Sequence, residues 1–223
     1  DALLEQVDDR TRIVYVSNPS NPTGSYNTGE EIRRLHEALP SSVILVVDEA
    51  YAEFVVEPDW ETAFPLARDA SNIVVTRTFS KIHGLGGLRI GFGYAPLAVV
   101  EAVDRIRLPF NVSVPGLDAA TAALGDEAHQ KASRDLVQTW RPRLTQAIRG
   151  FGFEVMPSAG NFIMVRFPDE ARNATAANDY LNGKGIIVRA VGGYGLPDCL
   201  RITVGTEDQN RAVIDALSEF AAR

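Results

Sequence analysis

The sequence predicts an α/β fold in which a mostly parallel sheet flanked by helices is followed by a small α+β domain. Before residue 125, short apolar runs alternate with helical patterns, which is the order typical of an α/β layer. After residue 150, short strands and helices interleave, as in a compact α+β unit. We therefore expect part of a large domain at residues 1–125, a connecting helix at 126–150 and a small C-terminal domain at 151–223.

The first expected strand is the apolar run at 13–16, which precedes the turn-rich segment SNPSNPTG. A helix should follow, because Thr28 and Glu31 have the spacing of a capping box and Pro40 ends the pattern. The next run, VILVV at 43–47, is apolar throughout, as in a strand buried on both faces of a parallel sheet. Further strands are expected at 73–75 and 88–95, and further helices at 97–106 and 117–124.

The second half of the chain opens with a polar helical stretch at 127–148, which Pro142 is expected to kink or split. The pattern after it changes to short segments. Strands are expected at 153–156, 161–165, 186–189 and 200–204, and helices at 171–181 and 207–222.

The amino-acid composition argues against nucleic acid and membrane as binding partners. Lys and Arg number 22 against 29 Asp and Glu, a formal charge of −7, whereas a nucleic-acid surface needs clustered cations. Cys199 is the only cysteine, which excludes an intrachain disulfide and favours a reducing compartment. No apolar run approaches the roughly 18 residues that cross a membrane. We expect a soluble, cytoplasmic protein that binds neither nucleic acid nor membrane.

Lys81 is the first candidate for chemistry, within TFSKIHGLGGLR. Thr78 and Ser80 precede it, and a glycine cluster and Arg89 follow. Hydroxyls, flexible backbone N–H groups and a guanidinium are the donors that a phosphate dianion needs. A lysine amine beside such a cradle could form a Schiff base with an aldehyde that the phosphate holds. The alternative is an ordinary solvated surface lysine.

Other ligand loops fit this segment poorly. Gly84, Gly86 and Gly87 do not have the G-x-G-x-x-G spacing of a dinucleotide loop. The phosphate loop of the G-x-x-x-x-G-K-[ST] type is also absent. The histidines at 36, 83 and 129 lack the spacing of metal ligands, so we expect no metal site.

Asp48 ends the buried run, within VVDEAY. Ligands of α/β sheets bind beyond the carboxyl ends of the strands, and a carboxylate there could keep a pyridine nitrogen protonated. A protonated ring is what would make a pyridine-containing cofactor an electron sink. Tyr51, and Asn21 in the NPTG turn, could both hydrogen-bond the phenolic oxygen of such a ring. The alternative for Asp48 is a helix cap at the end of a strand.

Together these motifs resemble the fold-type-I aminotransferases of class I and II. The likeness consists of Asn-Pro-Thr-Gly from Asn21, Asp-Glu-Ala-Tyr from Asp48, and Ser-Lys at Lys81 with Arg89 eight residues later. The resemblance implies a pyridoxal-phosphate-dependent transferase fold. It implies that Asp48 pairs with the pyridinium nitrogen and that Asn21 and Tyr51 contact the phenolic oxygen. Lys81 would carry the cofactor and move the substrate proton, and Thr78, Ser80 and Arg89 would hold the phosphate.

Within that class the chain is most similar to the histidinol-phosphate aminotransferase family. The likeness lies in TRTFSKIHGLGGLRIGFG, PFNVS, GIIVRA and CLRITVGT, and extends over essentially the whole chain. It implies that Arg201 binds the substrate carboxylate, a bidentate contact that would fix the α-carbon. Arg189 would face the substrate's phosphate, and Asn161 resembles a substrate-side residue. A surface ion pair is the alternative for Arg201.

The expected reaction is transamination between histidinol phosphate and 2-oxoglutarate in histidine biosynthesis, by a homodimer. An aromatic amino acid aminotransferase, or a decarboxylase on the same scaffold, remains open, as does the sensor domain of a transcription regulator. Members of the family usually run well past 300 residues. We therefore expect a longer parent polypeptide whose N-terminal part is missing here, so that this chain alone would be inactive and its sheet would have exposed hydrophobic edges.

Overall fold

The computed structural model describes residues 2–223, which form two compact units. The first unit comprises residues 2–19 and 26–130, and the second comprises 20–25 and 131–223. The short turn at 20–25 therefore belongs by its contacts to the C-terminal unit. Within the described residues, no helix is both long and apolar enough to cross a membrane.

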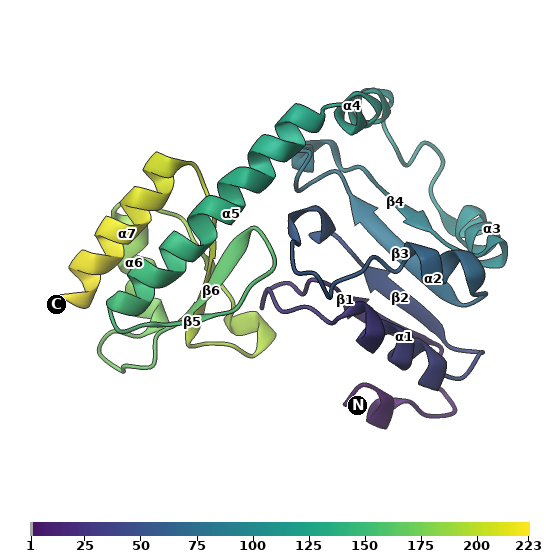
Figure 1. Ribbon diagram of the computed structural model, residues 1–223, viewed down its shortest axis with the longest axis horizontal. Helices are drawn as coiled ribbons and strands as arrows, with labels where there is room; N and C mark the ends of the chain where they lie inside the picture. The colour runs from purple at the N-terminus through teal and green to yellow at the C-terminus, as the bar shows by residue number, and fades with distance from the viewer. Residues whose placement is uncertain (1) are drawn as a thin grey trace. The chain divides into compact units, whose positions relative to one another are not determined.

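The first unit contains a four-stranded sheet (Figure 1). Its strands, in spatial order, are β1 (Ile13–Ser17), β2 (Ile44–Asp48), β3 (Ile73–Thr78) and β4 (Gly91–Tyr94). The first three strands are parallel and β4 is antiparallel to β3. The register aligns Ser17 with Asp48 and Asp48 with Thr76, so the carboxyl ends of the parallel strands meet at one edge.

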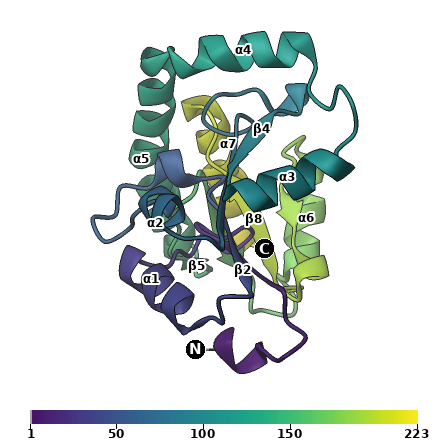
Figure 2. The same cartoon turned by 90° about the vertical axis from the view of Figure 1, so that its right-hand side faces the viewer.

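One face of this sheet forms the core of the unit. Alternate residues of the parallel strands point into it: Val14, Val16, Leu45, Val47, Ile73 and Val75. Helices α1 (Gly29–Ala38) and α2 (Phe64–Asp69) cover this face, and Figure 2 shows both on the same side of the sheet. The opposite face is open at β1, where Ile13 is 59% and Tyr15 58% exposed.

The capping box predicted at the start of α1 is present. Thr28 accepts from the backbone N–H of Glu31, and the Glu31 side chain accepts from the N–H of Thr28. Helix α2 was not predicted, because six residues are too few for a helical period. It begins with a proline in its first turn and buries Ala67 against the sheet.

The rest of the first unit contains three short 3₁₀ helices and two α-helices. These are η1 (Leu4–Gln6), η2 (Ala52–Phe54), η3 (Gly86–Leu88), α3 (Leu97–Ile106) and α4 (Val114–Leu124). The predicted strand at 88–95 is shorter than expected, because η3 takes up residue 88. Helix α4 begins three residues before its predicted start, because Ser113 caps it by accepting from the N–H of Gly116.

The second unit contains an antiparallel four-stranded sheet with helices. Its strands, in spatial order, are β5 (Glu154–Met156), β6 (Phe162–Arg166), β8 (Cys199–Thr203) and β7 (Arg189–Ala190). Its helical segments are α5 (Glu127–Gly150, whose first turn is in the first unit), α6 (Ala174–Gly183), η4 (Gly192–Tyr194) and α7 (Glu207–Ala221). The core includes residues 162–165 of β6 and, from α5, Leu144 and Ile148.

Three predictions for this unit need correction or comment. The strand predicted at 186–189 is wrong over 186–188, because only Arg189 and Ala190 pair with β8. Gly185 turns the chain with φ +76° after α6. Helix α6 begins at residue 174, where Asn173 caps it, instead of at 171. Helix α5 runs through Pro142 without a break, so the proline does not split it.

The three-part division predicted at 1–125, 126–150 and 151–223 differs from the compact units. Most of the predicted connecting helix belongs by its contacts to the second unit. Besides the segment 20–25, that unit comprises residues 131–223. The turn at 20–25 could not be assigned from sequence, because its partners lie more than 130 residues away in the chain. The domain limits of the whole protein stay a prediction.

Candidate active site

Asp48 lies at the edge of the first unit where three parallel strands end. Its backbone is paired with Ser17 on one side and with Thr76 on the other. The hydroxyl of Thr76 donates to Oδ1 of Asp48 at 3.1 Å. A carboxylate at a strand end retains acceptor sites for a further donor beside this hydroxyl. This is the placement expected of a group that binds a protonated ring nitrogen.

Tyr15, which was not a sequence candidate, belongs to the same group. It lies on the open face of β1, two residues before Ser17 and therefore on the same side of the strand. Burial raises the pKa of the Tyr15 hydroxyl, and the Asp48 carboxylate raises it further, while a hydrogen bond with Thr76 opposes the shift. Strand alternation could have placed Tyr15 on the face of Asp48, but only once the register of the strands was known.

Lys81 and Tyr51 are in contact. The Lys81 Nζ lies 5.0 Å from the centroid of the Tyr51 ring, a cation–π distance. Tyr51 is 4% exposed, at the start of η2 three residues after Asp48, whereas Lys81 is partly exposed three residues after β3. Within residues 2–223, the Lys81 ammonium has neither a hydrogen-bond nor an ion-pair partner. An amine that no carboxylate holds is available for reaction.

The segment from Thr78 to Arg89 forms a closed loop. The N–H of Phe79 donates to the carbonyl of Ile90 at 3.1 Å, which brings the two ends of the loop together. At one end, the N–H of Ser80 donates to the Thr78 hydroxyl at 3.0 Å. At the other, Arg89 is exposed, adopts φ +54° and donates to the carbonyl of Gly86 at 2.7 Å. The predicted phosphate-binding residues thus occupy the two ends of one loop.

Asn21 and Arg201 are joined in the second unit, although they are 180 residues apart in sequence. The Arg201 guanidinium donates to Oδ1 of Asn21, and it also lies 5.0 Å over the Phe162 ring. The Nε of Arg201 is buried and has no hydrogen-bond partner within residues 2–223. A guanidinium whose Nε has no hydrogen-bond partner can bind an anionic oxygen.

Arg189 lies beside Arg201 in the sheet of the second unit, and Asn161 directly precedes β6 of the same sheet. Arg189 is exposed and lies directly opposite Arg201 in the register of β7 and β8. Two cations directly opposite one another are unfavourable unless an anion lies between them. The backbone carbonyl of Asn161 accepts from the N–H of Val204 at 2.9 Å, which places this residue at the end of the same sheet.

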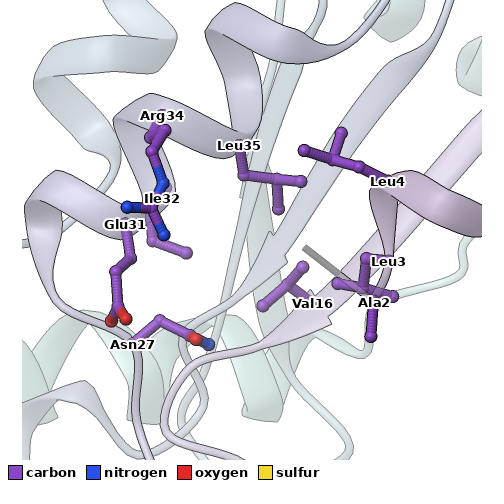
Figure 3. A pocket seen from close by; sticks show the side chains of 9 residues that line it. All are labelled: Ala2, Leu3, Leu4, Val16, Asn27, Glu31, Ile32, Arg34 and Leu35. Atoms are coloured by element: carbon purple, nitrogen blue, oxygen red, sulfur yellow. The ribbon is translucent and has the colours of Figure 1, made fainter.

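The structure therefore brings the predicted residues together in two groups. Asp48, Tyr51, Thr78, Ser80, Lys81 and Arg89 are in the first unit, and Asn21, Asn161, Arg189 and Arg201 are in the second. A hollow of about 230 Å³ in the first unit, shown in Figure 3, is lined by residues of the N-terminal segment, β1 and α1. None of the predicted site residues lines it.

Comparison with known proteins identifies the family. Residues 1–217 match the family described as aminotransferase class I and II. Two similar proteins are histidinol-phosphate aminotransferase 1 of Caulobacter vibrioides, 54% identical over 100% of this chain and 62% of its own length, and histidinol-phosphate aminotransferase of Maricaulis maris, 48% identical over 99% and 61%. The chain thus spans about three-fifths of the length of these relatives.

Solved structures agree. The histidinol-phosphate aminotransferase of Sinorhizobium meliloti, in complex with pyridoxal-5'-phosphate, is 34% identical with a TM-score of 0.87 over 94% of this chain and 57% of its own. A putative histidinol-phosphate aminotransferase from Erwinia carotovora atroseptica is 30% identical with a TM-score of 0.88, over 95% and 60%. These likenesses confirm the predicted fold. The chain belongs to the class I and II aminotransferase family.

Proposed function

We propose that the whole protein is a pyridoxal-phosphate-dependent aminotransferase that exchanges an amino group between histidinol phosphate and 2-oxoglutarate. The observation that carries the proposal is the Lys81 ammonium, 5.0 Å over the buried Tyr51 ring and without an ion-pair partner within residues 2–223. Relatives that are 47–54% identical and named histidinol-phosphate aminotransferase support the substrate. They favour it over an aromatic amino acid, a decarboxylation or a sensor role.

The side chains of the first unit fit this cofactor. The Lys81 amine would hold its aldehyde carbon, and Asp48, whose Oδ1 accepts from the Thr76 hydroxyl, would bind its ring nitrogen. Thr78, Ser80 and Arg89, at the two ends of one closed loop, would bind its phosphate. When bound, the cofactor supplies an electron sink for the substrate α-carbon.

The protein's own groups would then orient the substrate and move its proton. Lys81 would be the group that takes the substrate α-proton and returns it, since no carboxylate within residues 2–223 holds its amine. Tyr51 and Asn21 would donate to the phenolic oxygen of the cofactor. Tyr51 is held rigidly for this, because it is 4% exposed and packed under the Lys81 ammonium.

The second unit would bind the anionic groups of the substrates. Arg201 has a buried Nε without a partner among the described residues, and we assign to it the substrate carboxylate. Arg189, directly opposite in the sheet, would bind the substrate's phosphate. Because the two guanidiniums lie directly opposite one another, an anion bound at either would relieve their mutual repulsion. Asn161, at the end of the same sheet, is assigned to the substrate side.

We also propose that the whole protein is a homodimer in the cytoplasm. Helix α3 and the segment after it present a row of exposed apolar side chains, which favours a homodimer: Leu97, Val103, Ile106, Leu108 and Phe110. The single cysteine, Cys199, is buried and free, which suits the reducing cytoplasm.

The test is spectroscopic first and enzymatic second. The whole protein incubated with pyridoxal phosphate should gain a visible absorption band that borohydride removes, and Lys81→Ala should lack it. Glutamate should then form from 2-oxoglutarate when histidinol phosphate is the donor, and more slowly with aromatic amino acids. Absence of the band in the wild-type protein would refute the cofactor assignment. Release of carbon dioxide without glutamate would point to a decarboxylase.

A further inference from the structure

A largely buried cluster of ion pairs lies in the first unit, on the opposite face of the sheet from Thr76 and Thr78. Arg77 is at its centre, with Nη2 2.7 Å and Nε 2.9 Å from Oε2 of Glu49. Its Nη1 is 2.6 Å from Oε1 of Glu53, and its Nη2 also donates to the Thr62 hydroxyl at 3.2 Å. The Arg77 side chain is 15% exposed and Glu49 is fully buried. No role toward a ligand follows for these residues from the motifs or from the comparisons.

Glu49 uses both carboxylate oxygens. Oε1 accepts from the backbone N–H of Ala63 at 2.6 Å, and Oε2 accepts from the Thr62 hydroxyl at 2.8 Å as well as from Arg77. A buried carboxylate is costly unless it is paired and hydrogen-bonded, and here it is both. The guanidinium also lies 5.2 Å over the Phe64 ring. The cluster therefore fixes the planar side chain of Arg77 from several directions.

The sequence positions of this pair connect it to the candidate site. Glu49 directly follows Asp48, and Arg77 lies between Thr76 and Thr78 in β3. The N–H of Glu49 donates to the carbonyl of Thr76 at 3.0 Å, so the two strand ends are joined by backbone as well as by side chains. Strands β2 and β3 lie side by side (Figure 1). Because side chains alternate along a strand, Arg77 points away from the face of Thr76 and Thr78.

The ion pair thus ties two strand ends together from the side opposite to the candidate site. The ion pair adds to the backbone pairing of Asp48 with Thr76 in limiting how far Asp48 and the loop that begins at Thr78 can shift relative to one another. Gly91 in β4 shows how closely the backbone packs here, since a Cβ on it would lie 2.6 Å from the carbonyl oxygen of Arg77.

We propose that Arg77, through Glu49, is a positioning residue that holds Asp48 and the Thr78–Lys81 segment in register for the cofactor. The proposal rests on the function proposed above. Arg77 touches neither cofactor nor substrate in this account. Its effect is to set the distance between the group that binds the ring nitrogen and the groups that bind the aldehyde and the phosphate. A misplacement of about 1 Å between such groups can lower activity about a hundredfold.

The experiment compares cofactor binding by variants of the whole protein. Arg77→Gln removes the positive charge, whereas Arg77→Lys keeps the charge but loses the forked N–H donors of the guanidinium. Arg33→Gln is the matched control, because Arg33 pairs with Glu61 at 2.6 Å in the same unit but with both side chains about half exposed. Glu49→Gln is the second variant. It removes the charge of the other partner in the ion pair and is used if Arg77→Gln does not fold.

Three quantities are measured for each variant: the folded fraction by circular dichroism, the dissociation constant of pyridoxal phosphate, and the absorption maximum of the bound cofactor. We expect Arg77→Gln to bind the cofactor at least about tenfold more weakly per folded molecule, by the same positional argument. Its absorption maximum should move, because the spectrum depends on how closely Asp48 approaches the ring nitrogen. Arg77→Lys should recover part of the affinity, and Arg33→Gln should match the wild type.

Two results would overturn the inference. One is a folded Arg77→Gln protein with wild-type affinity and absorption maximum. The other is a loss of binding that only follows the loss of folded protein, with an unchanged maximum, since that is the behaviour of a purely structural ion pair. A wild-type protein that gains no visible band would instead refute the proposed function, so the two failures are distinguishable.

Discussion

Gly24, the last residue of the NPTG turn, is a position where the structure predicts a large effect of a single methyl group. Its φ is +79°, and a Cβ built on it would lie 2.2 Å from the Ser158 Oγ and 3.0 Å from the Ser158 Cα. The turn is closely attached there, because the N–H of Ala159 donates to the Gly24 carbonyl at 2.8 Å. Gly24→Ala therefore combines a left-handed backbone with a steric clash inside the second unit.

The two costs can be separated. A left-handed conformation costs a residue with a Cβ about 1–2 kcal/mol relative to glycine. Overpacking against Ser158 adds about 1–3 kcal/mol. Gly24→Ala should therefore lower the free energy of unfolding by about 2–5 kcal/mol. Gly152→Ala is the matched control, because Gly152 has φ +89° but no atom within 4 Å of a built Cβ, so that only the backbone cost applies.

The assay is urea unfolding followed by tryptophan fluorescence. Trp140 is 5% exposed in α5 of the second unit, and Trp60→Phe removes the tryptophan of the first unit, so the signal then reports on the second. In that background, Ser158→Gly should relieve most of the clash of Gly24→Ala, and a double-mutant cycle measures this coupling. Equal losses for the substitutions at 24 and 152, together with zero coupling to Ser158, would refute the steric argument.

Three further predictions concern stability and ionisation. Ile163 is fully buried in β6. Ile163→Ala should lower the free energy of unfolding by about 2–5 kcal/mol and Ile163→Val by only about 0.5–1.5 kcal/mol, as measured by urea unfolding. Hydrogen bonds from Lys184 and then Tyr180 hold the pKa of Glu219 below 4.5, so this contribution to stability is complete above that pH and is lost as the pH falls through the lowered value. Urea midpoints should therefore fall less on acidification in Glu219→Gln than in the wild type. The hydrogen bond to Asp59 raises the pKa of Tyr26 to about 12, so Asp59→Asn should move one phenolate titration, followed by ultraviolet absorbance, back toward 10.0.

The elements that the sequence predicted well are those whose signals are local. Apolar runs located β1, β2 and β3, and the helix predicted at 97–106 coincides with α3. Elements that depend on distant partners were missed or misplaced. Strand β7 is two residues long and exists only through its pairing with β8, so an apolar run could not locate it. Helix α2 has six residues, fewer than two turns.

The candidate site divides in the same way. Asp48 and Lys81 are marked by local motifs, and their order along the chain was enough to predict them as a group. Tyr15 and Thr76 join Asp48 only through the register of three strands, which no local pattern gives. The cluster of Glu49 and Arg77 was missed for a related reason, because charged residues beside a motif usually indicate solvent-exposed positions. The roles of all these residues toward a cofactor remain predictions.

The contact between Asn21 and Arg201 constrains what either residue can do. A guanidinium has only donors, so the atom of Asn21 that it reaches must be the amide oxygen, and the amide NH₂ is the end left for a ligand. Asn21 can therefore meet an acceptor such as a phenolic oxygen as a donor, which is the polarity that the proposed function requires. The same contact turns the guanidinium so that its Nε, buried and without a hydrogen-bond partner within residues 2–223, is left for an anion. This hydrogen bond, between residues 180 apart in sequence, therefore leaves both the Asn21 amide NH₂ and the Arg201 Nε available to ligands.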